Sequence, residues 1–330
     1  MLTALLVVLF RAAAPSIRTY GWSFLTSSEW RPNELEIREP ARGPDGKVRI
    51  EEGEVVMQTV KTIPPKFGAL PVIYGTAVSS LIALLFAIPL SLAAALFLVR
   101  VAPRLRIAAP VAFLIEFLAA IPSIAYGIWG LFVLGPFLQT HLEPFAHRML
   151  GHVYGFQWLF HQQVQIGGST ITRPLALTGF DMLCGGLILG IMILPIITAV
   201  SRDVLKAVPR AQIEGTLALG ATWWQSCREM LRYSRSGLFG AVMLGLARAA
   251  GETMAVTMVI GNNNQIAASV FAPAQTMSSL LANEFAEASG TMHRAALIEV
   301  ALILLLMSLL FNIVARYLVV GGNARTAAAH

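Results

Sequence analysis

The chain has 330 residues, of which 56% are hydrophobic and only 13% are charged. Soluble domains carry about 25% charged residues, so this composition excludes a soluble enzyme, a disordered regulator and a disulfide-rich scaffold. The sequence instead predicts an all-α polytopic membrane protein. The formal net charge is +6, but the basic residues flank apolar runs and form no single stripe. That pattern fixes orientation in a lipid membrane and argues against a nucleic-acid partner.

The chain starts with a short apolar run, residues 1–10, which Arg11 interrupts. Ten helical residues rise about 15 Å, half of the span that a bilayer requires. Two interpretations remain open. The run is a signal peptide cleaved within residues 12–14, although no basic region precedes it, or it belongs to a first transmembrane helix whose start is missing. We favour the second and assign residues 1–14 to a truncated first helix.

Five further segments are long and apolar enough to cross the hydrocarbon layer, which takes about 20 mostly apolar residues. The second contains Pro122 and Pro136, so we expect it to kink or to be partly re-entrant, because proline removes a backbone donor. With the truncated helix, these segments give a six-helix protein. The five spans are residues 74–99, 107–139, 177–200, 238–260 and 295–319.

Basic residues in the connections predict the orientation. Residues 100–106 hold three arginines and no acid, and residues 201–236 hold six basic side chains. The positive-inside rule places both in the cytoplasm, together with the tail 321–330. Residues 15–73 mix charges of both signs with Pro and Gly, and they are expected to form an external loop. The transmembrane domain is then residues 74–320.

The sequence lacks common catalytic and nucleotide-binding motifs. It contains no G-x-x-x-x-G-K-[ST], so a phosphate cradle for ATP is missing, and no G-x-S-x-G, H-E-x-x-H or C-x-x-C. Four histidines lie in the connection 140–176 without an acid or cysteine cluster, and we interpret them as solvated rather than metal-binding. We therefore expect no enzyme site, no metal and no cofactor in this chain. The four histidines are His141, His147, His152 and His161.

The connection 201–236 contains two helix-compatible stretches, residues 210–219 and 221–233, on either side of Gly220. Glycine after a helix adopts a positive φ without penalty, so the pattern predicts a helix–turn–helix that lies under the membrane. The pattern alone leaves open whether this element binds a partner or is an amphipathic interfacial segment.

Arg248 and Glu252 are charged residues within an apolar span. Arg248 lies ten residues beyond Leu238, so in a helix that begins there it is about 15 Å deep, and the i,i+4 spacing places Glu252 on the same face. Burial of either in lipid would cost several kcal/mol, so both must face a partner or a wet cavity. They form either an internal ion pair that holds helices together or a site where Arg binds an anion and Glu neutralises the empty site.

Three further acids lie in or near apolar spans. Glu116 is about ten residues into its span, so it could pair with Arg248 across the bundle. Asp181 and Glu299 lie nearer the outer ends of their spans, and we expect interfacial solvation for both. Several tryptophans, Trp30 among them, are plausible interface anchors.

Long motifs in this sequence resemble phosphate ABC transporter permeases of the PstC type. Residues 245–257, GLARAAGETMAVT, with Ile260-Gly261-Asn262, resemble the family signature, as do residues 280–288, LLANEFAEA, and 119–127, AAIPSIAYG. The likeness extends over the chain from about Pro15 onwards. It implies a six-helix type I (MetI-like) importer permease that moves inorganic phosphate across the bacterial cytoplasmic (inner) membrane by alternating access. It also implies Arg248 and Glu252 as translocation residues, with Glu116 as a further candidate.

A shorter motif resembles the Glu-Ala-Ala-x-x-x-Gly loop of ABC importer permeases. Glu214 and Gly220 match it, whereas Gly215 and Thr216 replace the alanines, and residues 230–233 replace the usual Ile-x-Leu-Pro. In that family the loop docks on a separate ATPase. The resemblance thus implies a second permease subunit, two ATPase copies that bind the ATP, and an external phosphate-binding protein. A permease for another tetrahedral oxyanion and an ion-coupled secondary transporter remain alternatives.

Overall fold

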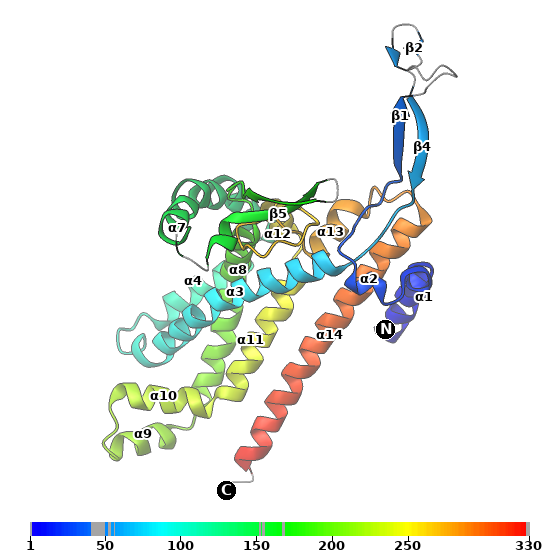
Figure 1. Ribbon diagram of the computed structural model, residues 1–330. Coiled ribbons are helices and arrows are strands. Elements are labelled where there is room, and N and C mark those ends of the chain that lie inside the picture. The colour runs from blue at the N-terminus through cyan, green and yellow to red at the C-terminus, as the bar shows by residue number, and fades with distance from the viewer. Residues whose placement is uncertain are drawn as a thin grey trace.

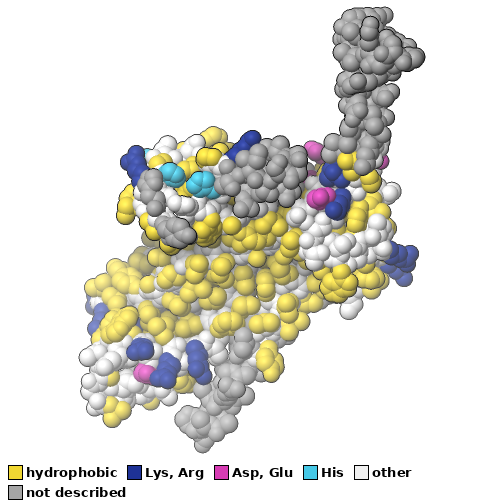
Figure 2. All heavy atoms as spheres, viewed as in Figure 1, with side chains coloured by type: hydrophobic (Ala, Val, Ile, Leu, Met, Phe, Trp, Pro, Cys, Tyr) yellow, Lys and Arg dark blue, Asp and Glu magenta, His cyan; other side chains and the backbone are white. Residues whose placement is uncertain are grey.

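The computed structural model describes residues 2–40, 50–51, 54–55, 57–151, 153, 156–166 and 169–327. The expected helical, multi-spanning body is confirmed, and Figure 2 shows a broad apolar surface across its middle, with basic and acidic side chains towards its ends. A shorter apolar helix covers Ala108–Ala120. Within the described residues, four helical segments are long and apolar enough to cross a membrane: Leu70–Val101, Ser123–Leu150, Met182–Lys206 and Thr291–Val314.

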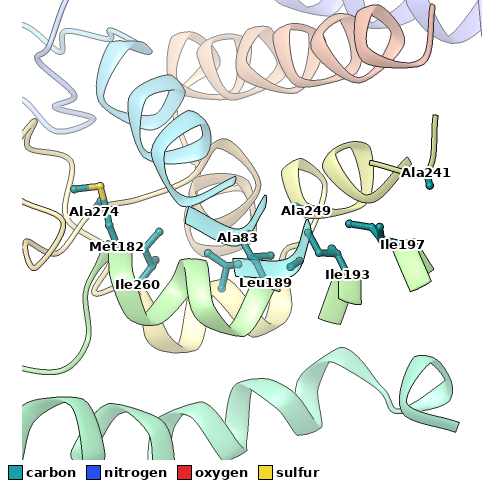
Figure 3. Close-up of a cluster of buried hydrophobic side chains, with 11 residues drawn as sticks. Ala83, Met182, Leu189, Ile193, Ile197, Ala241, Ala249, Ile260 and Ala274 are labelled. Carbon is teal, nitrogen blue, oxygen red and sulfur yellow. The ribbon is translucent and has the colours of Figure 1, made fainter. Parts of the chain in front are cut away.

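Two predicted spans correspond to single long helices at the centre of the body. They are α3 (Leu70–Leu96), which continues as a π-helical turn at Phe97–Val101, and α8 (Met182–Lys206). The helices pack closely because α8 presents glycine to α3: a Cβ on Gly186 would lie 2.6 Å from Cβ of Ile82. A buried cluster forms where both meet α11, and its labelled members in Figure 3 include Ala83, Leu189, Ile193, Ile197 and Ala249.

The predicted span 107–139 is two helices rather than one. The chain breaks at Ile121 and Pro122, as the proline predicts, because its ring cannot continue a helix. The helical path then runs past the predicted end at residue 139 and reaches Leu150. Its successive pieces are α4 (Ala108–Ala120), α5 (Ser123–Trp129), π-helical Gly130–Leu134, α6 (Gly135–Phe137), π-helical Leu138–Leu142 and α7 (Glu143–Leu150).

The predicted span 238–260 is also broken, which corrects the expectation of one helix. It consists of α11 (Arg235–Ala250) and α12 (Met254–Val259), separated by residues 251–253. Gly251 ends α11 by donating its N–H to the Ala247 carbonyl. The Glu252 carbonyl accepts a hydrogen bond from the hydroxyl of Ser278 rather than from a helical N–H. The chain continues through α13 (Met277–Glu284) into the long α14 (Thr291–Ala327).

The N-terminal run belongs to α1 (Leu2–Tyr20), which includes Arg11 and Pro15 and is followed by the short α2 (Ser23–Thr26). The helix packs along α14, and the two lie side by side in Figure 1. The predicted boundary at residue 14 therefore falls inside a helix.

The predicted external loops contain antiparallel strand pairs. The pair β1–β4 rises from the body near α2, and β5–β6 lies beside α7 (Figure 1). Leu175 donates to the Phe160 carbonyl at the end of a 3-10 turn at Gln157–Phe160, which extends the second pair by one further hydrogen bond. The pairs are β1 (Leu35–Pro40) with β4 (Met57–Ile63), β2 (Ile50–Glu51) with β3 (Glu54–Val55), and β5 (His161–Ile166) with β6 (Ser169–Pro174).

Two short helices lie at the opposite end of the body from α7 and the strands (Figure 1). They are α9 (Arg210–Ala218) and α10 (Trp223–Tyr233). Since α8 extends to Lys206 and α11 begins at Arg235, the first residues of the predicted connection 201–236 are the last turns of α8.

Candidate functional site

Arg248 and Glu252 form an ion pair at the break between α11 and α12. Nη2 of Arg248 lies 3.0 Å from Oε2 of Glu252. Arg248 is in the last turn of α11, and Glu252 follows the helix end at Gly251. The predicted pairing is confirmed, but the two residues do not share a continuous helix: the pair joins the end of α11 to the segment that leads into α12.

The two partners differ sharply in their exposure. The side chain of Glu252 is 4% exposed, whereas that of Arg248 is 48% exposed. A guanidinium has five N–H donors in a planar fork, so Arg248 keeps donors on its exposed side while one end holds the carboxylate. The half-exposed guanidinium is suited to bind an oxyanion, because its planar donors match the oxygens, while the buried acid holds its other end.

Two of the sequence motifs meet beside this pair. The segment 119–127 ends in α5, and residues 254–259 form α12, which packs on α5. Their backbones approach closely at Gly127, where a Cβ would lie 3.0 Å from Cα of Ala255. The two motif segments therefore pack together as one unit next to the break. The residue pattern of each segment alone does not reveal this contact.

The end of the long motif fixes the exit from α12. Gly261 has a φ of +88°, and a Cβ there would lie 2.5 Å from Cβ of Pro273, so only glycine fits. Nδ2 of the next residue, Asn262, donates to the Thr257 carbonyl at 2.7 Å. These contacts hold α12 in place beside the ion pair.

Glu116 contacts a different arginine from the expected one. Its Oε1 lies 3.4 Å from Nη1 of Arg202 on α8, and its side chain is 63% exposed. The expected pairing with Arg248 is therefore wrong. The reason is that α4 packs on α8, which carries Arg202.

Asp181 and Glu299 are buried, against the expectation of interfacial solvation. Asp181 caps α8, where its Oδ1 accepts the N–H of Cys184 at 2.8 Å. Residues 270–272 cover this helix end, since their carbonyls accept the N–H groups of Met182 and Leu183. Glu299 lies on α14 near Ser16 of α1. The hydropathy around Asp181 or Glu299 does not reveal that either is buried, because the residues that cover them are far away in the sequence.

Sequence reasoning missed Glu143, which is fully buried on α7. Its carboxyl lies beside that of Asp181 and the Gly179 amide. Within the described residues, neither Glu143 oxygen has a hydrogen bond of normal geometry. The sequence does contain a signal for this burial. Ala146 and Leu150 follow Glu143 at i+3 and i+7, so the three share one helix face, and the two apolar residues pack against a buried cluster.

The predicted helix–turn–helix is confirmed in α9 and α10. Gly220 forms the turn with a φ of +84°, which glycine adopts freely. Thr222 then starts α10 with a capping box, in which its hydroxyl accepts the Gln225 N–H and the Gln225 side chain accepts the Thr222 N–H. The stretch Glu214-Gly215-Thr216 lies within α9.

The surface of α9 is largely open. No residue of α9 is buried, a Cβ on Gly215 would touch nothing within 4 Å, and Leu219 just beyond the helix is 90% exposed. Thr216 instead turns inward: its hydroxyl donates to Ser226 at 3.3 Å, and Arg100 donates to the same serine at 3.4 Å. The element thus keeps one face on the body and leaves Glu214 and Gly215 on the other.

The chain is similar to known membrane transport proteins. The family described as "Binding-protein-dependent transport system inner membrane component" matches residues 87–320. The chain is 39% identical over 329 residues to the phosphate transport system permease protein PstC of Mesorhizobium japonicum, covering 99% of this chain and 87% of that protein. It is 37% identical over 320 residues to the protein of the same name from Haemophilus influenzae, covering 97% and 87%. Among solved structures, an inward-facing MetNI methionine ABC transporter shows 15% identity and a TM-score of 0.49, covering 77% of this chain and 94% of that chain.

Proposed function

Because this chain belongs to the family of binding-protein-dependent transport system inner membrane components, we propose that it is the permease subunit of an ATP-driven phosphate importer. The observation that carries the proposal is the Arg248–Glu252 pair at a helix break, with the arginine half-exposed. Relatives named as phosphate transport permeases span nearly the whole chain and support phosphate as the substrate. The fold is then the type I, MetI-like importer permease fold.

The pair suits the alternate binding and release of a tetrahedral oxyanion. In the empty site Glu252 neutralises Arg248, so a guanidinium does not stand unpaired within the membrane. Phosphate offers oxygens in a geometry that the guanidinium fork matches with two parallel hydrogen bonds. When phosphate arrives, it competes with the carboxylate for Arg248. When it leaves, the pair closes again, which keeps binding weak enough for passage.

Motion reaches this site from α9 and α10. In the proposed orientation these helices face the cytoplasm, and the open face of α9 with Glu214, Gly215 and the Gly220 turn docks on an ATPase. Only Ser234 separates α10 from α11, so a displacement of α9 and α10 moves α11. Arg248 lies thirteen residues along α11, about 20 Å from its start, and therefore near the end of α11 that is farthest from α10.

The complex requires partners that this chain does not supply. We propose a second permease subunit that faces the Arg248 side, two copies of an ATPase that bind the ATP, and an external phosphate-binding protein. We place this complex in the bacterial cytoplasmic membrane. Closure of the ATPase dimer would open the path outward and then inward in turn, without covalent chemistry in this chain.

The test is phosphate uptake by cells that lack the chromosomal copy of this chain and carry it on a plasmid, with and without the ATPase subunit. Uptake that needs both supports the proposal. Uptake that persists without the ATPase would favour an ion-coupled secondary transporter. Competition by sulfate stronger than competition by phosphate would point to another oxyanion as the substrate.

A further inference from the structure

Glu284 joins three parts of the molecule that are distant in sequence. Its Oε2 accepts the indole N–H of Trp30 at 2.8 Å and lies 3.0 Å from Nε2 of His293. Trp30 belongs to the segment between α2 and α3, Glu284 is the last residue of α13, and His293 is in the first turn of α14. One carboxylate oxygen thus receives donors from two other elements.

Aromatic packing encloses this contact. The ring of Phe67 stacks on His293 at 5.4 Å between centroids and meets Trp30 edge-on at 5.1 Å. The side chains of His293 and Glu284 are only 13% and 22% exposed. We call these four residues the Glu284 junction. Hydrogen bonds to an ionised acceptor in such a partly buried place are about twice as strong as neutral ones, so the junction fixes Glu284.

The same helix touches the ion-pair site at its other end. Ser278, in the first turn of α13, donates its hydroxyl to the backbone carbonyl of Glu252 at 2.6 Å. A capping box at Thr276 fixes that end, and the Met277 N–H donates to Thr76 of α3. Ser278 and Glu284 are six residues apart, about 9 Å along a helix, so α13 is a short strut between the junction and the site.

From this geometry we infer that Glu284 is a positioning residue for translocation, acting through α13 on the Glu252 side of the ion pair. The inference rests on the proposed function. When the segment that carries Trp30 moves relative to α14, Glu284 moves with its donors and tilts α13. Ser278 then shifts the Glu252 carbonyl and changes the contact with Arg248. Events at the face that bears β1 and β4 therefore reach the site without passing through α9 and α10.

This role also explains the motif LLANEFAEA at residues 280–288. Its glutamate forms the junction, and its last alanine, Ala288, accepts a hydrogen bond from Nε of Arg294 at 2.6 Å. The indole of Trp30 is accordingly hydrogen-bonded within the protein.

The test compares Glu284→Ala and Glu284→Gln with the control Glu287→Ala, which changes an exposed acid of the same motif. The purified complex in phospholipid vesicles is assayed for basal ATP hydrolysis, for hydrolysis stimulated by the phosphate-loaded binding protein, and for phosphate uptake. We expect Glu284→Ala to lower the stimulated rate and the maximal uptake about tenfold, the equivalent of one charged hydrogen bond. Basal hydrolysis and the phosphate concentration for half-maximal uptake should stay unchanged.

The conservative variant and two further changes separate positioning from stability. Glu284→Gln keeps an acceptor for both donors, so it should retain at least about half of the stimulation. Ser278→Ala, at the far end of α13, and Trp30→Phe should reproduce the Glu284→Ala defect. The double variant Glu284→Ala with Ser278→Ala should be no worse than either single change, because both act along one route.

Several results would overturn the inference. Stimulation in Glu284→Ala equal to that in Glu287→Ala would do so, as would parallel loss of basal and stimulated hydrolysis, or a normal Ser278→Ala variant. If Glu284→Ala does not yield a complex, Glu284→Gln and Trp30→Phe report on the same junction. A wild-type complex that moves no phosphate would instead refute the proposed function itself.

Discussion

Replacement of Arg248 by glutamine tests the proposed site directly. The change removes the positive charge and the planar fork but keeps one amide that can still donate to Glu252. Because the Glu252 side chain is only 4% exposed, the variant leaves a buried carboxylate without its counter-charge, and breaking a buried pair in this way costs about 3–5 kcal/mol. The glutamine amide can still donate to that carboxylate and offsets part of the cost, so recovery of the folded complex is measured beside transport.

Transport should fall much further than stability. Two charge-assisted hydrogen bonds to an oxyanion, at about 1.5–3 kcal/mol each, correspond to a loss of at least ~100-fold in uptake. Arg248→Lys keeps the charge without the fork and should recover only part of the activity. The assay is phosphate uptake by the vesicle-bound complex, with the recovered complex measured by size-exclusion chromatography. Arg148→Gln, a change of an exposed arginine on α7, is the control. Normal uptake by Arg248→Gln would reduce the pair to a structural contact and refute the reasoning.

Three other changes have defined outcomes. Glu214→Arg reverses a charge on the open face of α9 and should lower co-purification of the ATPase; a wild-type yield would count against docking there. Gly127→Val forces a side chain against the backbone of α12, where Cα of Ala255 would already lie 3.0 Å from a Cβ, so overpacking should cost about 1–3 kcal/mol and lower the thermal midpoint by several degrees; an unchanged midpoint would show that the contact between α5 and α12 tolerates a larger side chain. Glu143→Gln supplies an amide donor for the neighbouring Asp181 and should match or exceed the thermal midpoint of the wild type. Glu143→Leu cannot donate, so its free energy of unfolding should be about 1 kcal/mol lower than that of Glu143→Gln; the reverse order would contradict the buried carboxyl contact.

Local patterns were sufficient for features whose cause is local. Apolar length predicted α3 and α8 because a spanning helix needs only its own residues. Gly220 predicted the turn between α9 and α10 for the same reason, and Pro122 predicted the break before α5. The signals in these cases are a run of apolar residues, a glycine with positive φ and a missing backbone donor.

Long-range packing decided the features that the sequence did not predict. The break after Gly251 lies in an apolar stretch without proline, and it is held by Ser278, 26 residues away from Glu252. Asp181 is buried because residues 270–272 fold over its helix end. Trp30 and Glu284 are 254 residues apart. No periodicity in one segment encodes which distant segment will cover it, so each of these required the assembled fold.

The break between Arg248 and Glu252 changes what their ion pair can do. On one continuous helix, an i,i+4 pair would keep nearly the same separation in every state, because the helix backbone fixes it. In this structure the arginine moves with α11, which follows α10, whereas the Glu252 carbonyl is held by Ser278 of α13. A small rotation of α11 relative to α13 therefore opens or closes the pair. In the proposed mechanism, the affinity of Arg248 for an anion then depends on both ends of the molecule, one through α9 and α10 and the other through Glu284, and an alternating-access permease requires such a dependence of its site.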